Sequence, residues 1–583
     1  MRALVLFKRA AADMQQAARP VCALCTKWGL SCEYSIPAQD RQENMMSEAR
    51  GVPVLWSRPD ATDIIDPNQT GALDFMSFPG LNFDSSTPVL PKWHPDSGVS
   101  SEDQSLLQET HLPSHDLLVE LVELFFEHLY HVFPCFHQKA FTEQVKMGRI
   151  QDRSPLLLFA MCCVTARFHA DATVRQREKE WYEHAKFSYQ LTQRNPYPAL
   201  PTIQAALLIV EYAHTAGDFS SAWLLIGKAW RQAIALGMNR MDASSAVSGY
   251  KKIDDMDVDD HTDAPVKDGK GLSALDKEEQ RRTMWLLFIV DRYHSWPTSW
   301  PNALPETHFK VDMPVADSAF QTMKPLAKHS VATTTPFTRN LRRLITSPNL
   351  ANEPVKVFCY ICIAHVILGR VAELVHSLHE SPNTPEYVED CEELDSYLVK
   401  LRLSIPCQAS SVLEAQASDK GFVVWLQVVL NTSAMLLNYR RAKSVSAPDA
   451  SSRCLVAVAA ARHTAQIVRD ASRVSIELLI TPHIASSLYI AALLLVIEWR
   501  TTGNAKLKEE IDLIALVFDR MNEAFTYLGL KFKYALEHDL EKSRGKMLEE
   551  LRELGLRGLL ADCSKWSHIK DRLVRNGIHI EIT

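Results

Sequence analysis

The feature that most constrains the fold is a helical spacing of apolar residues that starts at Ser114 and recurs almost to the end of the chain. In the first such segment the apolar positions recur every three or four residues, share one face of a helix and end before Pro134. They are Leu117, Leu118, Leu121, Val122, Phe125, Leu129 and Val132. Further segments of this kind cover roughly residues 155–169, 174–194, 202–214, 220–237, 274–295, 355–380, 386–404, 411–443, 451–477, 483–501 and 505–537, with shorter ones to 577. A strand-like alternation occurs only at residues 578–582, so the sequence predicts an all-α fold.

The region before these segments has a different composition. Residues 36–115 hold nine prolines and twelve acidic residues against four Lys or Arg, and they show no sustained helical period. Such a composition is typical of a disordered linker, and its prolines exclude the heptads of a zipper dimer. Within it, Leu73–Asp84 interleaves acids with large apolar side chains, which suits either an activation segment or a patch that packs back onto the helical part.

Three cysteines near the start, Cys22, Cys25 and Cys32, follow the spacing C-x2-C-x6-C. Two thiolates separated by two residues can bind one zinc ion from a single tight turn. Residues 1–21 contain no other cysteine and no histidine, so only half of a six-cysteine ligand set is present. The chain carries a net charge of -7, but residues 1–36 hold five Lys or Arg against two acids. Any contact with nucleic acid is therefore expected there.

Other chemistries find little support in the sequence. The catalytic motifs G-x-S-x-G, G-x-x-x-x-G-K-[ST], H-E-x-x-H and G-x-G-x-x-G are absent, and only 20 of 583 residues are glycine. His128, His131 and His137 straddle a helix end, which favours core or surface roles over a ligand set. Cys359 and Cys362 lie in an apolar run and are expected inside a buried helix. The acidic residues 254–263 do not match the template of a calcium-binding loop. Because the catalytic motifs are absent, we predict that the protein is not an enzyme.

Several segments resemble a known family. Residues 27–34, with Pro20 before the first cysteine, resemble the second half of the six-cysteine binuclear zinc cluster of fungal transcription factors. Three helical segments and a short turn resemble the middle homology region of the same regulators. These are Phe125–His137 with Phe141, Gly227–Arg240, Glu278–Arg292 and Val311–Pro314. One departure is Trp300-Pro301-Asn302, which stands where the family has Gly-Arg-Pro.

The resemblance implies four parts: a partial zinc-cluster DNA-binding region at 1–36, a disordered acidic and Pro-rich linker at 37–114, a helical middle homology region at 115–345 and a C-terminal helical part of the same regulatory domain at 346–583. The expected fold class is therefore all-α, with a large helical regulatory domain preceded by a disordered linker and a truncated N-terminal zinc-cluster remnant.

The function implied is that of a nuclear transcription factor that regulates RNA polymerase II genes, such as a metabolic or secondary-metabolite gene cluster, through zinc-dependent DNA binding. Zinc is expected on Cys22, Cys25 and Cys32 only if the missing cysteine triplet is present in the true protein. The base-reading lysines of the family belong to that triplet, so Arg19 and Lys27 are expected to contact phosphates alone. The implied partners are double-stranded promoter DNA, the transcription machinery or coactivators, and a small-molecule inducer.

Two alternatives remain open. The chain could be a DNA-binding-deficient relative that senses a ligand or acts on other proteins through its helical domain, or the first residues could come from a gene-model error. The N-terminal basic residues would also suit a mitochondrial presequence. No membrane partner is expected, because the longest apolar run, residues 488–497, is too short to span a bilayer.

Overall fold

The computed structural model describes residues 111–192, 199–243, 272–325, 334–347, 350, 354–376, 384–441, 448–543, 545–546 and 563–577. Four of the predictions fall outside these residues: the cysteine cluster, almost all of the linker, the acidic insertion 254–263 and the strand at 578–582. Residues 96–583 group into one compact unit. The described residues of this unit form no β-strand. They contain one isolated β-bridge, which joins Met313 to Thr335. The all-α prediction is confirmed.

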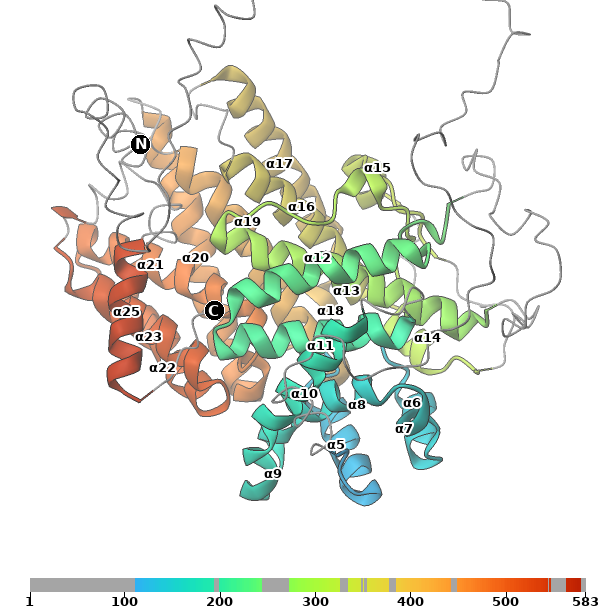
Figure 1. Ribbon diagram of the computed structural model, residues 1–583. Coiled ribbons are helices and arrows are strands. Elements are labelled where there is room, and N and C mark those ends of the chain that lie inside the picture. The colour runs from blue at the N-terminus through green and yellow to red at the C-terminus, as the bar shows by residue number, and fades with distance from the viewer. Residues whose placement is uncertain are drawn as a thin grey trace, which may run out of the picture. The chain divides into compact units, whose positions relative to one another are not determined.

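The first half of the helical unit is built from helices of three to twenty-five residues (Figure 1). In chain order they are α5 (His115–His128), α6 (Gln138–Lys146), α7 (Arg149–Arg153), α8 (Pro155–Thr165), η1 (Ala166–Phe168), α9 (Ala172–Gln176), α10 (Glu178–Leu191), α11 (Leu200–Ala216), α12 (Phe219–Ala235), η3 (Met238–Arg240), α13 (Ala274–Thr298), η5 (Glu306–His308), α14 (Asp317–Gln321) and α15 (Leu341–Ile345).

The second half contains helices of three to twenty-seven residues, among them the apolar α16 and α21. They are α16 (Val357–His376), α17 (Pro385–Ser404), α18 (Cys407–Ser410), η7 (Ala417–Asp419), α19 (Lys420–Arg441), α20 (Pro448–Val474), η8 (Ile476–Leu479), η9 (Pro482–Ile484), α21 (Ala485–Thr502), α22 (Ala505–Ala524), α23 (Thr526–Glu541) and α25 (Cys563–Arg575).

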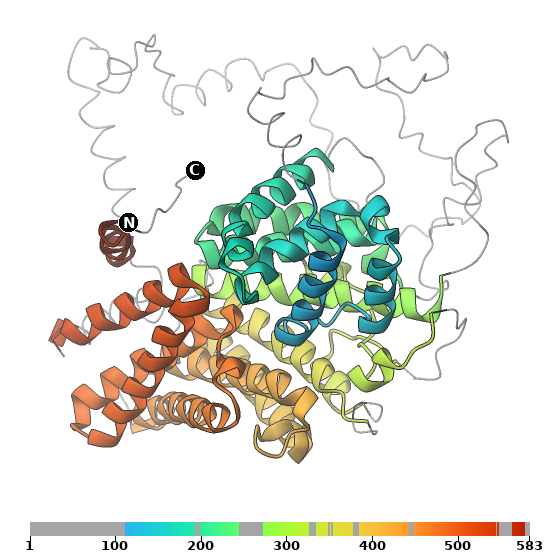
Figure 2. The same cartoon turned by 90° about the horizontal axis from the view of Figure 1, so that it is seen from below.

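Helices α13 and α16 lie between the two halves. Figure 2 shows the N-terminal helices on one side of this pair and the orange and red C-terminal helices on the other. Helix α13 packs against α11 and α12 on one side and α16 on the other, and α16 in turn packs against α19. Because neighbours surround it, α13 is buried on nearly every face from Arg281 to Trp296. A polar atom on α13 that lacks a partner inside the protein therefore loses its hydrogen bonds to water.

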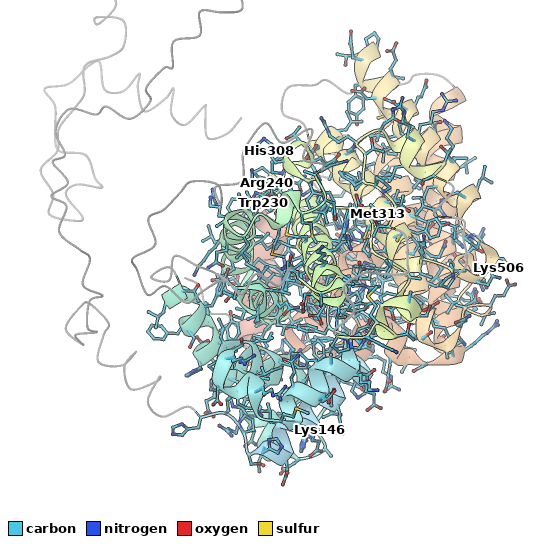
Figure 3. All side chains as sticks on the ribbon, turned by 90° about the vertical axis from the view of Figure 1, so that its right-hand side faces the viewer. Lys146, Trp230, Arg240, His308, Met313 and Lys506 are labelled. Carbon is cyan, nitrogen blue, oxygen red and sulfur yellow. The ribbon has the colours of Figure 1, made fainter. Side chains whose placement is uncertain are left out.

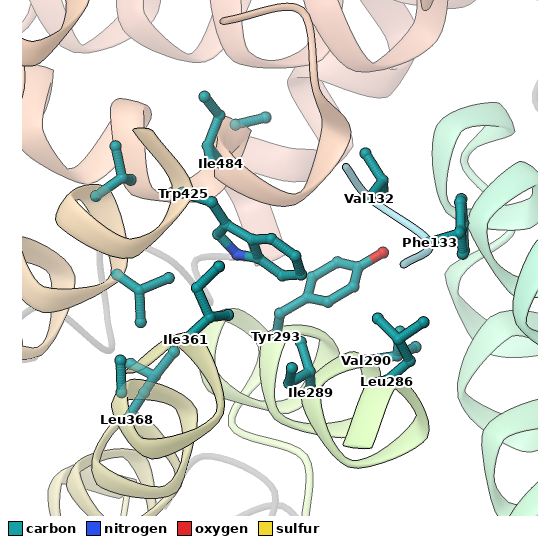
Figure 4. Close-up of a cluster of buried hydrophobic side chains, with 14 of the residues drawn as sticks. Val132, Phe133, Leu286, Ile289, Val290, Tyr293, Ile361, Leu368, Trp425 and Ile484 are labelled. Atoms are coloured by element: carbon teal, nitrogen blue, oxygen red, sulfur yellow. The ribbon is translucent and has the colours of Figure 1, made fainter. Parts of the chain in front are cut away.

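The centre of the unit is a large apolar core. Figure 4 shows Tyr293 of α13 facing Trp425 of α19, with Ile361 of α16 and Ile484 of η9 beside them. Each of these side chains is at most 6% exposed. Segments separated by almost 200 residues thus share one core, which couples the folding of the two halves.

Three predicted helices differ from the observed ones. The segment 174–194 is divided at Arg177 into α9 and α10, and the segment 411–443 becomes regular only at Lys420. The segment 505–537 is divided at Phe525 into α22 and α23, which pack against each other as a tight pair. A Cβ atom at Gly529 would lie 2.3 Å from the backbone nitrogen of Asn522, so only glycine permits this approach.

Three helical segments are long and apolar enough to cross a membrane by length and composition alone, namely Val357–His376, Ala417–Tyr439 and Pro482–Thr502. Their most apolar windows are 83%, 100% and 78% buried inside the protein. The last segment contains the run 488–497 and extends beyond it at both ends, so the argument from the shortness of that run does not hold for the helix as a whole. What these segments contact in this structure is the protein core.

Candidate functional site

The residues predicted to bind zinc and DNA phosphates lie outside the described part of the chain. These are Cys22, Cys25 and Cys32 for the metal, and Arg19 and Lys27 for the phosphates. Within the described ranges, no group of three or more His, Cys, Asp or Glu side chains is placed to hold a metal ion. The sites that the structure does describe are built around helix α13.

The start of α13 is a capping box. The Ser273 hydroxyl accepts the backbone N–H of Asp276 at 3.1 Å, and the Asp276 carboxylate accepts the N–H of Ser273 at 3.2 Å. One turn later Glu278, 1% exposed, accepts three hydrogen bonds. Its donors are Arg281 at 2.6 Å, Arg282 at 3.1 Å and the backbone N–H of Val315 at 2.9 Å. This carboxylate therefore joins α13 to the loop that precedes α14.

The Arg282 guanidinium is completely buried and all three of its nitrogen atoms donate hydrogen bonds. Nε donates to Glu278, Nη1 to the Pro134 carbonyl and to Asp317 (both 2.9 Å), and Nη2 to the Val315 carbonyl (2.9 Å). Burial alone would lower the pKa of Arg282, but the charges of Asp317 and Glu278 raise it. Arg282 stays charged and ties α13 to the turn after α5.

A second ion pair holds the loop that follows α13. Arg292 donates to Asp291 at 2.6 Å and to the Leu304 carbonyl at 2.7 Å, while Asp291 accepts the backbone N–H groups of Ala303 and Leu304. The Arg292 guanidinium lies 3.7 Å from the centre of the Phe288 ring. A Cβ atom at Gly369 of α16 would lie 2.9 Å from Arg292 Cγ, so this glycine allows α16 to pack over the pair. Arg281, Arg282 and Arg292 of this helix thus each pair with an acid inside the protein.

The end of α12 is joined to the same region. Arg281 donates to Asp242 at 2.8 Å, and Asp242 accepts the backbone N–H of Asp312 at 2.8 Å. The Asn239 side chain of η3 donates to the His308 carbonyl at 2.8 Å. Figure 3 shows Arg240 and His308 next to each other at this junction. The segments that resemble the middle homology region thus meet around one polar network.

A group of buried histidines lies in the core between the two halves. His294 and His365 each bond a backbone carbonyl one turn back through Nδ1, at 2.8 Å. Their Nε2 atoms, with Nδ1 of His214 and of His483, are buried and find no hydrogen-bond partner in the described part of the chain. Burial lowers the pKa of His294 and His365 to about 4, and that of His131 likewise. These rings are neutral at neutral pH.

An acid and a lysine lie close to the histidines. Tyr293 donates to Glu211 at 2.8 Å, and burial raises the pKa of Glu211 to about 7 against the lowering effect of that bond. Lys531 of α23 lies near His214, and burial lowers its pKa to about 7. This part of the core carries groups that titrate near neutrality, which makes its stability sensitive to pH.

The three histidines singled out in the sequence do not form a ligand set. His128 stacks on Phe168 with ring centres 4.7 Å apart, and His137 caps α6 by accepting the N–H of Ala140 through Nδ1 at 3.1 Å. His131 lines a separate pocket. Cys359 and Cys362 are fully buried in α16 as predicted, and the Cys359 thiol donates to the Pro314 carbonyl.

A pocket of about 680 Å³ opens where α5, α14, α16 and the start of α19 meet. Its wall includes Asp317, which pairs with Arg282 and also accepts a 2.6 Å hydrogen bond from the Tyr130 hydroxyl. Asp419 of η7 lines the pocket as well. Burial raises the pKa of Asp419 above its ordinary value, and the nearby charge of Asp317 adds to that rise. The volume is within the range of small-molecule sites.

Sequence reasoning missed this pocket and the histidine group. Asp317 and Asp419 are 102 positions apart, and each looks like an ordinary surface acid in its own segment. His214, His365 and His483 are likewise isolated in apolar helices. The only available signal was the presence of a histidine in otherwise apolar helical runs, which by itself does not indicate that such residues meet.

Comparison with known proteins identifies part of this architecture. Residues 122–338 match the family model described as the fungal specific transcription factor domain. The chain is 28% identical over 308 residues to the Zn(2)-C6 fungal-type transcription factor FTF1c of Fusarium oxysporum f. sp. lycopersici, which covers 50% of this chain and 30% of the relative.

Two further relatives match at similar levels. Zn(2)-C6 fungal-type transcription factor FTF2 of the same organism is 27% identical over 294 residues, covering 48% of this chain and 25% of the relative. Transcription factor AN6788 of Emericella nidulans is 27% identical over 217 residues, covering 37% of this chain and 30% of the relative. The matches span less than a third of the length of these relatives.

Proposed function

We propose that this chain is a fungal transcription regulator whose helical unit is the regulatory domain. The observation that carries the proposal is the match of residues 122–338 to a fungal transcription factor domain, within which lies the buried network around α13. The names of the three relatives support a role in transcription and a regulatory rather than a catalytic activity. On this proposal the protein acts in the nucleus on genes read by RNA polymerase II, with a metabolic or secondary-metabolite gene cluster as its target.

The N-terminal region is the proposed DNA-binding part. Cys22, Cys25 and Cys32 would hold zinc if the missing cysteine triplet is present in the true protein, and Arg19 and Lys27 would contact phosphates of promoter DNA. A structural zinc ion takes four ligands, so three thiolates leave one position to another group. The donor set thus suits one incomplete zinc site and falls short of a six-cysteine cluster. The alternative is that the chain acts without binding DNA itself, through its helical unit and the transcription machinery or coactivators.

A tethering assay tests the regulatory role separately from DNA binding. The whole chain is fused to an unrelated DNA-binding domain and directed to a reporter promoter in a fungal host. Reporter output is expected to change at least several-fold relative to the unfused domain. Glu278→Gln, which weakens the α13 network, is expected to reduce that change, whereas Glu523→Gln in an exposed surface pair is the matched control. Unchanged output in both the parent and the control would refute the proposed function.

A second assay decides between the two forms of the proposal. The purified chain is mixed with fragmented genomic DNA, with zinc or with a chelator, and the retained fragments are sequenced. Zinc-dependent enrichment that Cys22→Ser, Cys25→Ser and Cys32→Ser together abolish would support direct binding, with the exposed Cys407→Ser as the control. Absence of enrichment from a chain that is active in the tethering assay would support the alternative.

A further inference from the structure

The pocket beside α14 joins the two halves of the helical unit. Its wall is formed by α5, the turn after it and α14 on one side, and by α16, η7 and α19 on the other. The lining residues of the first set lie within the matched residues 122–338, and those of the second lie beyond them. A molecule bound here would contact both halves at once.

One part of the wall is aromatic. Phe126, Phe358 and Phe422 all line the pocket and are almost completely buried. The rings of Phe358 and Phe422 have their centres 6.2 Å apart and are tilted by 43°. Such a surface favours a flat apolar body, because aromatic faces and edges add to the gain from burying apolar area.

The charged part of the wall is acidic. Three carboxylates line it, those of Glu127, Asp317 and Asp419, and the lining residues that the structure describes include no Lys or Arg. Arg282 compensates Asp317 from behind the wall. Asp419 forms no salt bridge with any described residue, and it accepts a hydrogen bond from the neighbouring Ser418 hydroxyl at 3.3 Å. The wall keeps an uncompensated negative charge, which repels anions and attracts cations.

A polar atom without a partner lies in the same wall. His131 lines the pocket, and its Nε2 is buried without a hydrogen-bond partner within the described ranges. A buried nitrogen of this kind loses its bond to water and regains nothing from the protein.

We propose that this pocket binds a small organic cation, an amine with a flat apolar body, which packs on Phe358 and Phe422 and places its ammonium group beside Asp419. The ammonium group would compensate Asp419 while the apolar body fills the space between α5 and α19. Since the ligand holds the two halves together, its binding would stabilise the helical unit. Its role as an effector of transcription rests on the proposed function, whereas binding itself does not.

Three indoles of similar size serve as probes for the charge preference. Tryptamine carries an ammonium group, 3-methylindole is neutral and indole-3-propionate carries a carboxylate. Each is titrated calorimetrically into the full chain at pH 7. Tryptamine is expected to bind tightest, 3-methylindole more weakly and indole-3-propionate weakest of the three.

Three substitutions test whether tryptamine binds beside Asp419. Asp419→Asn is expected to weaken tryptamine binding on the order of tenfold, about the effect of one partly screened ion pair, and to leave 3-methylindole unchanged. Glu414→Gln removes an exposed carboxylate of the same stretch that does not line the pocket, and it is expected to change neither. Ser418→Lys adds a cation at an exposed pocket residue and should abolish tryptamine binding without disturbing the core.

The proposal is wrong if indole-3-propionate binds as tightly as tryptamine, or if none of the probes binds. It is also wrong if Glu414→Gln and Asp419→Asn weaken the binding of tryptamine equally. None of these results would alter the outcome of the tethering assay, so the pocket can fail while the proposed function stands. Conversely, a chain that is inactive in the tethering assay can still bind tryptamine as predicted.

Discussion

Glu278 shares the Arg282 guanidinium with Asp317, and Asp419 lies near Asp317, but the surroundings of Glu278 and Asp419 differ sharply. Glu278 is buried and accepts three hydrogen bonds, two of them from arginines. Asp419 lies in an open pocket near another acid, and it forms no ion pair within the described residues. The comparison indicates that the α13 network stabilises the scaffold, whereas the pocket retains a carboxylate that no described Lys or Arg pairs.

The largest expected effect is on the α13 network. Glu278→Gln keeps the shape of the side chain but leaves Arg281 and Arg282 with less opposing charge in a buried site. Removing one partner of a buried ion pair costs about 3 kcal/mol or more, and we expect a loss of that size in the free energy of unfolding. Denaturant unfolding measures it.

Glu523→Gln is the control for that change. The Glu523 side chain is 65% exposed and that of its partner Arg520 is 54% exposed. Replacing this glutamate by glutamine should therefore change the free energy of unfolding by less than about 0.5 kcal/mol. Equal losses in the two variants would remove the distinction between a buried network and a surface pair.

A smaller effect is expected from the buried histidines. The folded pKa of His365 is about 4, below its ordinary value of 6.5, because of burial. Between these values the unfolded chain binds a proton that the folded chain does not, so stability falls as the pH falls from 6.5 to 4. At pH 5 one such histidine lowers the free energy of unfolding by about 2 kcal/mol.

His365→Leu removes this contribution. The stability difference between pH 7 and pH 5, measured by urea unfolding, should be smaller in this variant than in the parent by about 2 kcal/mol. Glu211 and Lys531 also titrate in the core, but both proteins retain them, so their effects cancel in the comparison. Parallel losses in the two proteins would mean that His365 is accessible to protons in the folded state.

The smallest effect is expected at Asp419. Its raised pKa means that the folded state holds the charged form less readily than the unfolded state does, so the charge lowers stability at neutral pH. Because the side chain is only partly buried, Asp419→Asn should raise the free energy of unfolding by no more than a few tenths of a kcal/mol. A loss above about 1 kcal/mol would show that Asp419 has a structural role.

Local patterns were sufficient for much of the fold. The all-α fold and the burial of Cys359 and Cys362 could be predicted, because apolar residues recur at helical spacing along each of these segments. The break at Phe525 could not, since no proline marks it and the close approach at Gly529 depends on how α22 and α23 pack. The pocket was also beyond sequence reasoning, because its acids come together only through tertiary structure.

The most direct test of the account follows thermal unfolding of the parent and of Asp419→Asn as tryptamine is added. Without ligand, the variant is predicted to be slightly more stable than the parent. Tryptamine should stabilise the parent more, because a ligand that prefers the native state raises stability according to its affinity. The order of the two melting temperatures is therefore predicted to reverse with increasing tryptamine. Melting temperatures that rise in parallel, or do not rise, would contradict a pocket that keeps Asp419 uncompensated for a cationic ligand.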